Sequence, residues 1–419
     1  MGGLPTRASI LVLITLPPLS DRRLAVRVTP DATRQIRGGH PWIFASSIAS
    51  VSDGGTTGDL AVVFDRNRRF LAIGLYDPES PIRIRMLHHG PPVTIDSSFW
   101  SERLDAARAI RQPLELTTET TAYRIINGEN DGFPGLVLDR YASTLVLKLY
   151  SAAWLPHLGV LVPLIQARWQ PASVVLRISR ALQRDHPELE GTSLVGPLPT
   201  APVQFIENGL SFEADVIRGQ KTGHFLDQRD NRNCVRALAG NARVLDVFAC
   251  TGGFSAYAAA GGAVEVHSVD ISAGALKASA TNVRANNPGG STKHLTTVGD
   301  AFEVMRTLVA EGERYDVVVI DPPSFAHRRS EAAGGLRAYR QLTELGLALT
   351  ADGGTLVQAS CSSRISAVSF FESVESTARA VGASVTVLEK SEHPIDHPIG
   401  FVHGAYLKAM FLRVNRHRS

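Results

Sequence analysis

The chain has 419 residues, of which 44% are apolar and 20% are charged. This is the composition of an ordinary globular protein, and it excludes a chain that is disordered throughout. The formal net charge of +3 permits an anionic partner without requiring one, because a local basic patch matters more than the sum. At about 100–200 residues per domain, the length predicts two or three domains.

The cysteines Cys234, Cys250 and Cys361 are too few for a disulfide framework and lack the spacing of a zinc site. We therefore expect no metal and a reducing, cytoplasmic setting. The apolar run at residues 8–16 is far too short to span a bilayer. A signal peptide is the alternative interpretation, but no clean cleavage site follows, so we favour a simple N-terminal extension and no membrane contact.

Residues 24–92 contain short apolar stretches at 24–28, 60–64 and 70–75, separated by turns, which predicts a small β-rich domain. Basic side chains in this region lie near two aromatic ones. We expect them to bind RNA phosphates, the alternative being a solvated surface with the tryptophan in the core. The residues concerned are Arg34, Arg37, His40, Trp42, Phe44, Arg83 and Arg85.

Residues 99–200 mix helical and strand patterns and predict a small central α/β domain. Apolar residues recur at helical spacing over 99–111 and again over 154–169. Strand-like runs occupy 136–138, 144–149 and 173–178, and a proline-rich linker at 196–202 ends the region.

From residue 203 to 419 apolar strands alternate with helices, which predicts a Rossmann-like, doubly wound sheet. The strands are expected at 243–248, 265–269, 316–320 and 354–358, and the helices at 255–261, 273–286, 301–310 and 336–350. In such a sheet ligands bind at the carboxyl ends of the strands.

The turn after the first of these strands has a Gly-Gly pair and a carboxylate, Asp246, within the strand. This differs from the dinucleotide fingerprint, which needs a phosphate at a helix N-terminus. A carboxylate suits the positive sulfonium and amino groups of S-adenosylmethionine. Asp270 follows the second strand, where a ribose-binding acid is expected. Asp300 follows a further strand, in Val298-Gly299-Asp300, and could bind near the adenine. Helix capping is the alternative for any one of these acids. The predicted cofactor residues here are Asp246, Phe248, Thr251, Gly252, Gly253, Phe254, Asp270, Asp300 and Asp321.

The next two strand ends carry the candidate catalytic groups. Asp321 is followed by Pro322 and Pro323, which fix a stiff, non-helical exit, and a flat base could stack on Phe325. A plain proline-terminated strand is the alternative. Cys361 follows the neighbouring strand among small polar residues, which favours a nucleophile over an inert core thiol. Cys250 is expected to pack against the ligand and Cys234 to fill a helix.

Together these residues resemble the RlmI-type family of bacterial large-subunit ribosomal RNA cytosine-5 methyltransferases. The resemblance extends over nearly the whole chain from about residue 24. Its motifs are His40–Phe44, Arg124–Leu136, Lys221–Arg232, Thr251–Phe254, Asp321–Pro323, Ser360–Ser362 and Asp396–Pro398. Cys250 stands where the family pattern has a tyrosine.

The resemblance implies an N-terminal PUA domain at 24–92, a central domain at 99–200 and a methyltransferase domain at 203–419. It implies S-adenosylmethionine as cofactor, 23S ribosomal RNA as partner, a homodimer, and Cys361 as nucleophile with Asp321 assisting. We also expect four residues at the entrance to the last domain to border the cofactor, namely Phe225, Asp227, Gln228 and Arg229. The RNA contacts would come from Pro322, Pro323, Phe325, Arg37, His40, Trp42, Arg83 and Arg85.

In this chemistry a thiolate adds to carbon 6 of cytosine and makes carbon 5 able to attack a methyl donor. Asp321 would hydrogen-bond ring nitrogen 3, and the target base must leave its stack. The alternatives are an N-methyltransferase of guanine or adenine, which needs no cysteine, a carbon-5 uracil methyltransferase, and a non-catalytic RNA-binding assembly module.

Overall fold

The computed structural model describes residues 16–326 and 328–415, so the apolar run at 8–16 lies outside the described residues except for Leu16. The chain divides into two compact units. The first contains the residues up to Phe205 with Ala214–His224 and Ile395–Phe401, and the second contains Ile206–Glu213, Phe225–Pro394 and the residues from Val402 onward. Among the described residues, no helix is both long and apolar enough to cross a bilayer.

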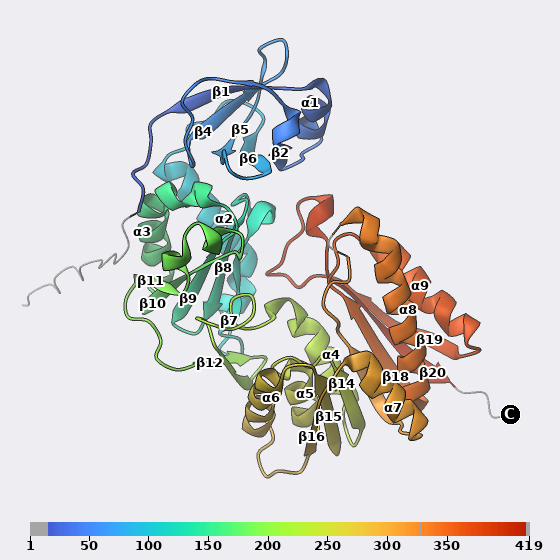
Figure 1. Ribbon diagram of the computed structural model, residues 1–419. Helices are drawn as coiled ribbons and strands as arrows, with labels where there is room; N and C mark the ends of the chain where they lie inside the picture. The colour runs from blue at the N-terminus through green and yellow to red at the C-terminus, as the bar shows by residue number, and fades with distance from the viewer. Residues whose placement is uncertain (1–15, 327, 416–419) are drawn as a thin grey trace, which may run out of the picture. The chain divides into compact units, whose positions relative to one another are not determined.

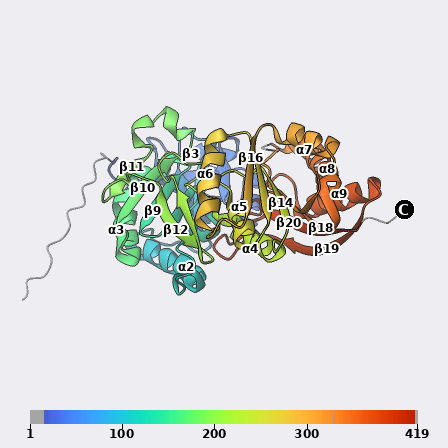
Figure 2. The same ribbon diagram turned by 90° about the horizontal axis from the view of Figure 1, so that it is seen from below.

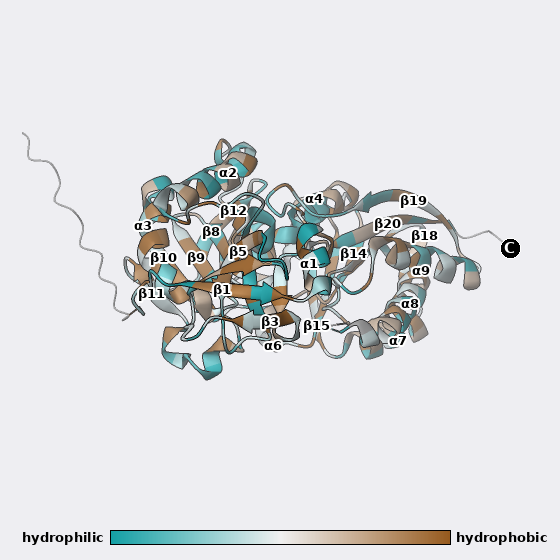
Figure 3. Cartoon of the chain, turned by 90° about the horizontal axis from the view of Figure 1, so that it is seen from above, coloured by the Kyte–Doolittle hydropathy of each residue, from teal (hydrophilic) through white to brown (hydrophobic). Residues whose placement is uncertain are grey.

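The first unit begins with a six-stranded sheet of order β2-β6-β5-β4-β1-β3 (Figure 1). Its strands are β1 (Arg23–Val28), β2 (Trp42–Phe44), β3 (Ile48–Val51), β4 (Leu60–Phe64), β5 (Phe70–Tyr76) and β6 (Ile82–His89). Exposed and buried residues alternate along β1, as in a strand with one face on a core, and β5 is apolar along most of its length (Figure 3). The predicted β-rich N-terminal domain is confirmed.

A helix, α1 (Pro30–Arg37), interrupts these strands and was not predicted. Thr29 caps it by accepting a hydrogen bond from the backbone nitrogen of Ala32 at 3.3 Å, and Pro30 occupies its first turn. These start signals are present in the sequence, but a helix of two turns is too short to show a clear period.

The second sheet of the first unit has the order β11-β10-β9-β8-β7. Its elements are α2 (Ser97–Glu115), β7 (Ala122–Asn127), β8 (Leu136–Tyr141), β9 (Thr144–Leu149), α3 (Leu158–Trp169), β10 (Ser173–Ile178) and β11 (Thr192–Val195). The helix α3 joins the parallel pair β9 and β10, while the other neighbours are antiparallel. The aromatic core includes Trp100, whose ring centroid lies 5.4 Å from that of Trp154 and 5.8 Å from that of Phe133.

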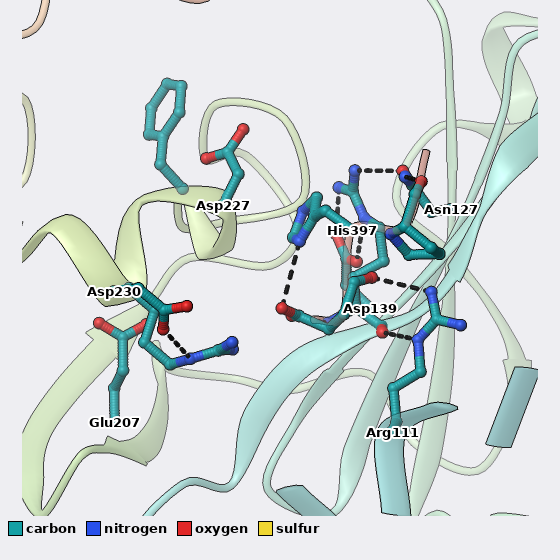
Figure 4. A network of polar contacts seen from close by, with 12 residues as sticks. Arg111, Asn127, Asp139, Glu207, Asp227, Asp230 and His397 are labelled. Atoms are coloured by element: carbon teal, nitrogen blue, oxygen red, sulfur yellow. Dashed lines mark hydrogen bonds and ion pairs between the residues drawn. The ribbon is translucent and has the colours of Figure 1, made fainter. Parts of the chain in front are cut away.

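A buried polar network completes the first unit and includes the late Asp-His-Pro motif (Figure 4). Arg111, whose side chain is fully buried, binds both carboxylate oxygens of Asp131 at 2.7 and 2.8 Å. It also donates to the carbonyl oxygen of Asp396 at 2.8 Å. The Asp396 carboxylate accepts from the backbone nitrogen of Arg124 at 2.9 Å. The motif therefore stabilises this unit.

After the hairpin of β12 (Val203–Glu207) and β13 (Leu210–Ala214), the second unit forms a seven-stranded sheet of order β16-β15-β14-β17-β18-β20-β19. The strands are β14 (Arg243–Val247), β15 (Glu265–Asp270), β16 (Lys293–Val298), β17 (Tyr315–Ile320), β18 (Thr350–Ser360), β19 (Ser384–Ser391) and β20 (Lys408–Asn415). The first five are parallel, and β20 is antiparallel to both of its neighbours. The predicted Rossmann-like sheet is confirmed.

Helices cover both faces of this sheet (Figure 2). They are α4 (Arg229–Leu238), α5 (Gly253–Ala260), α6 (Ala273–Ala285), α7 (Ala301–Ala310), α8 (Ala332–Leu349) and α9 (Ala367–Ala380). One core layer joins the sheet to α4 and α5, and a separate layer joins it to α7, α8 and α9. Because both faces are covered, the central strands β14, β15 and β17 are buried along most of their length, and ligand-binding groups are expected at their carboxyl ends.

Candidate active site

The turn between β14 and α5 has an unusual backbone. Phe248, Cys250 and Gly252 have φ values of 66°, 49° and 75°, in the left-handed region that side chains rarely adopt. A Cβ at Gly252 would collide with Ser279 of α6, so this glycine is required by helix packing as well as by its φ. A Cβ at Gly253 would lie 3.0 Å from Cδ of Arg232. The turn is therefore held on two sides by helices.

Asp246 lies at the base of this turn and is almost completely buried. Its Oδ2 accepts hydrogen bonds from the backbone nitrogen of Ser255 at 3.0 Å and from the Ser255 hydroxyl at 2.6 Å. Its Oδ1 is buried and has no hydrogen-bond partner among the described residues. Burial raises the pKa of Asp246 to about 6. A buried acceptor with a spare lone pair fits a ligand that brings a positively charged donor.

Asp270 braces the same turn from the end of β15. One carboxylate oxygen accepts from the backbone nitrogen of Cys250 at 2.9 Å, and the other accepts from that of Ser272 at 2.8 Å. Each oxygen keeps a lone pair that a ribose hydroxyl could use. Asp300 differs, because it is exposed and caps α7 by accepting from the backbone nitrogen of Glu303 at 3.1 Å. For Asp300 the capping alternative is what the structure shows, and a contact with adenine stays a prediction.

Two apolar residues at these strand ends were missed by the sequence analysis. Ile271 is 75% exposed and follows β15, and Val298, the last residue of β16, is 56% exposed. Val298 stands in register with Asp270 on the neighbouring strand. Exposed aliphatic side chains beside the Asp270 carboxylate offer apolar surfaces on which a purine ring could pack. The signal was present as an apolar residue next to each acid, but exposure cannot be read from sequence.

The catalytic candidates lie at the adjacent ends of β17 and β18, which are parallel neighbours. The Cys361 sulfur donates to the carbonyl oxygen of Pro322 at a distance of 3.7 Å. The Ser362 hydroxyl donates to the carbonyl oxygen of Ala326 at 3.1 Å and so joins the two loops. The expected placement of Cys361 beside the Asp-Pro-Pro exit is therefore what the structure shows, with Asp321 next to Pro322.

Phe325 packs inside the domain. Its ring centroid lies 5.2 Å from that of Tyr339 in an edge-on contact and 6.3 Å from that of Phe302. This packing gives Phe325 a structural role in holding the exit, and the stacking of a base on its ring stays a prediction.

The entrance segment before α4 is buried and polar. Asp227 accepts a hydrogen bond from the hydroxyl of Tyr406 at 2.8 Å, and Gln228 accepts one from the Asn231 side chain at 2.6 Å. Arg229 is also buried and bonds to Asp230 at 3.2 Å (Figure 4). A contact of this segment with the cofactor stays a prediction.

Arg232 ties the same segment to the turn between β14 and α5. It donates to the carbonyl oxygen of Phe225 at 3.0 Å and binds both oxygens of the buried Glu207. Its Cδ also lies beneath Gly253, as described above. Arg232 was missed because its partners are far away in the sequence.

The predicted RNA contacts in the first domain need a correction. Arg85 is only 7% exposed and is paired with Glu129 at 3.3 Å, and Trp42 donates its ring N–H to the same carboxylate at 2.7 Å. These two residues stabilise the first unit. Arg37 is exposed but paired with Asp65 at 3.2 Å.

Two further predicted contacts, His40 and Arg83, are held by local hydrogen bonds. His40 has its Nδ1 3.0 Å from the carbonyl oxygen of Trp42. Arg83 is half-buried and donates to the carbonyl oxygen of Asp77 at 3.5 Å. Neither geometry excludes a bond to phosphate, so a role for these two residues in RNA binding stays a prediction.

The same sheet has a basic cavity elsewhere. Its volume is about 470 Å³, and its lining consists of Ala25, Arg27, Ser50, Val51, Ser52, Phe64 and Arg68. Arg27 and Arg68 are exposed, and Arg27 bonds to the Ser50 hydroxyl at 3.0 Å. Guanidinium groups beside an aromatic ring can bind phosphate and stack with a base. The described residues contain no cluster of side chains able to hold a metal ion.

Comparisons with known proteins agree with this geometry. A model of S-adenosylmethionine-dependent methyltransferases matches residues 170–413, and a model of the PUA-like domain matches residues 26–89. The chain is 48% identical over 409 residues to a protein of Deinococcus radiodurans named ribosomal RNA large subunit methyltransferase, covering 96% of this chain and 100% of that one. It is 34% identical over 378 residues to ribosomal RNA large subunit methyltransferase I of Escherichia coli strain K12, covering 90% and 95%.

Solved structures share the fold. One, from Streptococcus mutans, is described as a candidate SAM-dependent methyltransferase and matches with a TM-score of 0.79 at 21% identity, covering 93% of this chain and all of that one. Another, a candidate methyltransferase complexed with SAH, matches with a TM-score of 0.80 at 21% identity, covering 94% and 100%.

Proposed function

The chain belongs to the S-adenosylmethionine-dependent methyltransferase family, and we propose that it methylates carbon 5 of a cytosine in 23S ribosomal RNA through a covalent adduct of Cys361. The names of its relatives support the RNA substrate. The observation that carries the chemistry is the thiol of Cys361, 3.7 Å from the carbonyl oxygen of Pro322 at the neighbouring strand end. The homodimer and the cytoplasmic setting stay predictions.

The carboxyl ends of β14, β15 and β16 fit the cofactor. The buried Oδ1 of Asp246 suits the amino group of S-adenosylmethionine, Asp270 the ribose hydroxyls, and Ile271 with Val298 the adenine ring. The cofactor supplies an electrophilic methyl group when it is bound. The turn of Thr251 to Phe254 would orient the cofactor, because α4 and α6 fix the backbone of that turn.

The residues at the ends of β17 and β18 act on the base. The Cys361 thiolate adds to carbon 6 of the cytosine, which makes carbon 5 nucleophilic. Asp321 in its protonated form holds ring nitrogen 3 and stabilises the charge that develops there. Carbon 5 then takes the methyl group from the donor, and transfer of the carbon-5 proton to a water molecule allows the thiolate to leave carbon 6. Pro322 and Pro323 keep the exit rigid, so that these groups meet the unstacked base in one geometry.

A mechanism-based trap tests this proposal. RNA that carries 5-fluorocytidine lacks the carbon-5 proton, so methylation should leave the enzyme covalently attached. We expect a complex that survives denaturation, requires S-adenosylmethionine and is absent in Cys361→Ala. The matched control is Cys234→Ala, since Cys234 lies in α4 and bonds to Glu389 at 3.5 Å.

Three results with the cysteine variants separate the alternative mechanisms. Cys250→Ala should still trap, because burial raises the pKa of Cys250 to about 11 and keeps it a thiol. Loss of the trap in Cys250→Ala with unchanged cofactor affinity would assign the adduct to that cysteine. Normal methylation by Cys361→Ala would instead indicate transfer to an exocyclic nitrogen.

We further propose that the basic cavity lined by Arg27, Phe64 and Arg68 binds the RNA backbone and orients the substrate. Arg27→Ala and Arg68→Ala should each lower the slope of log K against log salt concentration by about 1, because each loses one phosphate contact. Arg85→Ala is the control variant. It should lower the free energy of unfolding and leave the salt slope unchanged, because Arg85 is buried against Glu129. An unchanged slope in the Arg27→Ala Arg68→Ala double variant would exclude this cavity.

A further inference from the structure

Lys408 is a buried lysine that the proposed chemistry does not yet use. It is the first residue of β20, it is 2% exposed, and it stands in register with Ser360, the last residue of β18. Cys361 is the next residue after Ser360. The antiparallel pairing of β18 with β20 therefore places a cationic side chain beside the strand end that carries the nucleophile.

The Lys408 amine is surrounded by backbone carbonyl groups. Its Nζ donates to the carbonyl oxygens of Ser362, Ile365 and Tyr406, the last two at 2.7 and 2.9 Å. Three acceptors need three N–H donors, which an ammonium group has and a neutral amine lacks. Two of the three carbonyls belong to the loop that begins at Cys361. The geometry thus indicates a charged lysine that holds this loop in place.

Other charged and titratable groups surround this pair. Burial lowers the pKa of Lys408 to about 8, and the negative charges of Cys361 and of the exposed Glu392 oppose that lowering. Asp321 and Tyr339 also interact electrostatically at this strand end, and His393 packs its ring against Tyr406. The Asp321 carboxylate, when ionised, disfavours a second negative charge nearby. A cation beside Cys361 offsets this repulsion whenever Asp321 is ionised.

We propose that Lys408 is a positioning residue for methyl transfer, whose ammonium group fixes the loop after β18 and favours the thiolate form of Cys361. This rests on the proposed role of Cys361 as nucleophile. A cation buried next to a thiol lowers the free energy of the thiolate without touching the substrate. The pairing of β18 with β20 holds Lys408 close to Cys361, so the effect on the thiol follows from the structure of the sheet.

The test is the pH dependence of Cys361 alkylation in the full chain. Iodoacetamide modifies the thiolate, and mass spectrometry of the peptide containing Cys361 separates it from the other cysteines. In Lys408→Met the pH midpoint for Cys361 should rise by about one unit, which is a tenfold loss of thiolate at neutral pH. Lys408→Arg, which keeps the charge, should restore at least half of that shift. The midpoint of Cys234 serves as the internal control and should stay constant.

Activity gives a second readout. The kcat of Lys408→Met should fall by about tenfold at neutral pH and recover as the pH rises, with the affinity for S-adenosylmethionine unchanged. A folded Lys408→Met variant whose Cys361 midpoint equals that of the native chain would overturn the proposal. Alkylation needs no RNA, so this result is distinct from the failure of the carbon-5 mechanism.

If Lys408→Met does not fold, the Cys361→Ala variant tests the coupling between the two residues instead. Because the Cys361 thiolate raises the pKa of Lys408, replacing the cysteine with alanine should lower the lysine pKa. Titration of 13C-labelled lysine side chains by NMR measures that pKa in the native chain and in Cys361→Ala. Equal values in the two proteins would contradict the coupling between the two residues.

Discussion

At the carboxyl edge of the large sheet, the two halves hold their loops by side-chain hydrogen bonds of opposite direction. At β14, β15 and β16 carboxylates accept hydrogen bonds from backbone nitrogens, as Asp270 does from Cys250. At β17, β18 and β20 a lysine donates to backbone carbonyls. In the proposed mechanism the first half presents negative charge to the cationic cofactor, and Lys408 in the second half presents positive charge to the thiolate of Cys361. One sheet edge can therefore bind an electrophile and activate a nucleophile next to it.

The largest expected effect concerns the first half. Asp270→Ala removes the acceptor of the Cys250 backbone nitrogen and the predicted acceptor of the ribose hydroxyls. We expect S-adenosylmethionine affinity to fall by about 2–3 kcal/mol, the cost of losing a charge-assisted hydrogen-bond pair. Calorimetry measures this directly. Asp300→Ala is the matched control and should weaken binding far less, because Asp300 is exposed and caps α7. Unchanged affinity in Asp270→Ala would remove that residue from the site.

The second effect is a pH dependence of cofactor binding. Burial raises the pKa of Asp246 to about 6, so in the cofactor-free chain its contribution to stability is complete below its ordinary pKa of 3.8 and is lost as pH rises through about 6. A cationic ligand binds the ionised form and lowers this pKa. Affinity for S-adenosylmethionine should therefore fall below about pH 6, by up to tenfold per unit, with proton release on binding.

The control for this pH dependence is Asp246→Asn, which keeps the shape of the side chain and removes its titration. Calorimetry in buffers of different ionisation enthalpy counts the protons released. We expect weaker binding by Asp246→Asn at neutral pH and no change in affinity across about pH 5 to 7. A native chain whose affinity is flat over this range would show that Asp246 does not face the cofactor's charge.

The sequence predicted which residues lie at the strand ends, but it did not predict the direction in which their side chains point. Parallel strands bring their carboxyl ends to one edge, so Asp246, Asp270 and Asp321 could be placed together from periodicity alone. The choice between ligand binding and capping depends on local hydrogen bonds, and for Asp300 the structure shows the cap.

Residues with distant partners were the ones that the sequence analysis misjudged or did not name. Trp42 bonds to Glu129, 87 positions away, and Lys408 bonds to the carbonyl of Ser362, 46 positions away. Neither pairing leaves a local pattern. The basic and aromatic residues of the first domain looked like an exposed RNA surface, although Arg85 is buried. Likewise β19 and β20 were not predicted, and β20 departs from the strand-helix alternation because it pairs antiparallel with both of its neighbours.

The smallest expected effect concerns the second half and separates it from the first. The Ser362 side chain is fully buried, and its hydroxyl donates to the Ala326 carbonyl oxygen at 3.1 Å, which joins the loop after β18 to the Asp-Pro-Pro exit. Ser362→Ala loses this hydrogen bond and a longer one that the hydroxyl accepts from the backbone nitrogen of Arg364 at 3.4 Å. Together they are worth about 1 kcal/mol, so kcat should fall by roughly fivefold. Ser363→Ala is the matched control, because Ser363 is the exposed neighbour on the same loop. S-adenosylmethionine affinity should not change in either variant. If Ser362→Ala weakened cofactor binding as much as turnover, the two halves would act as one unit, and their contrast in hydrogen-bond direction would not correspond to a division of labour.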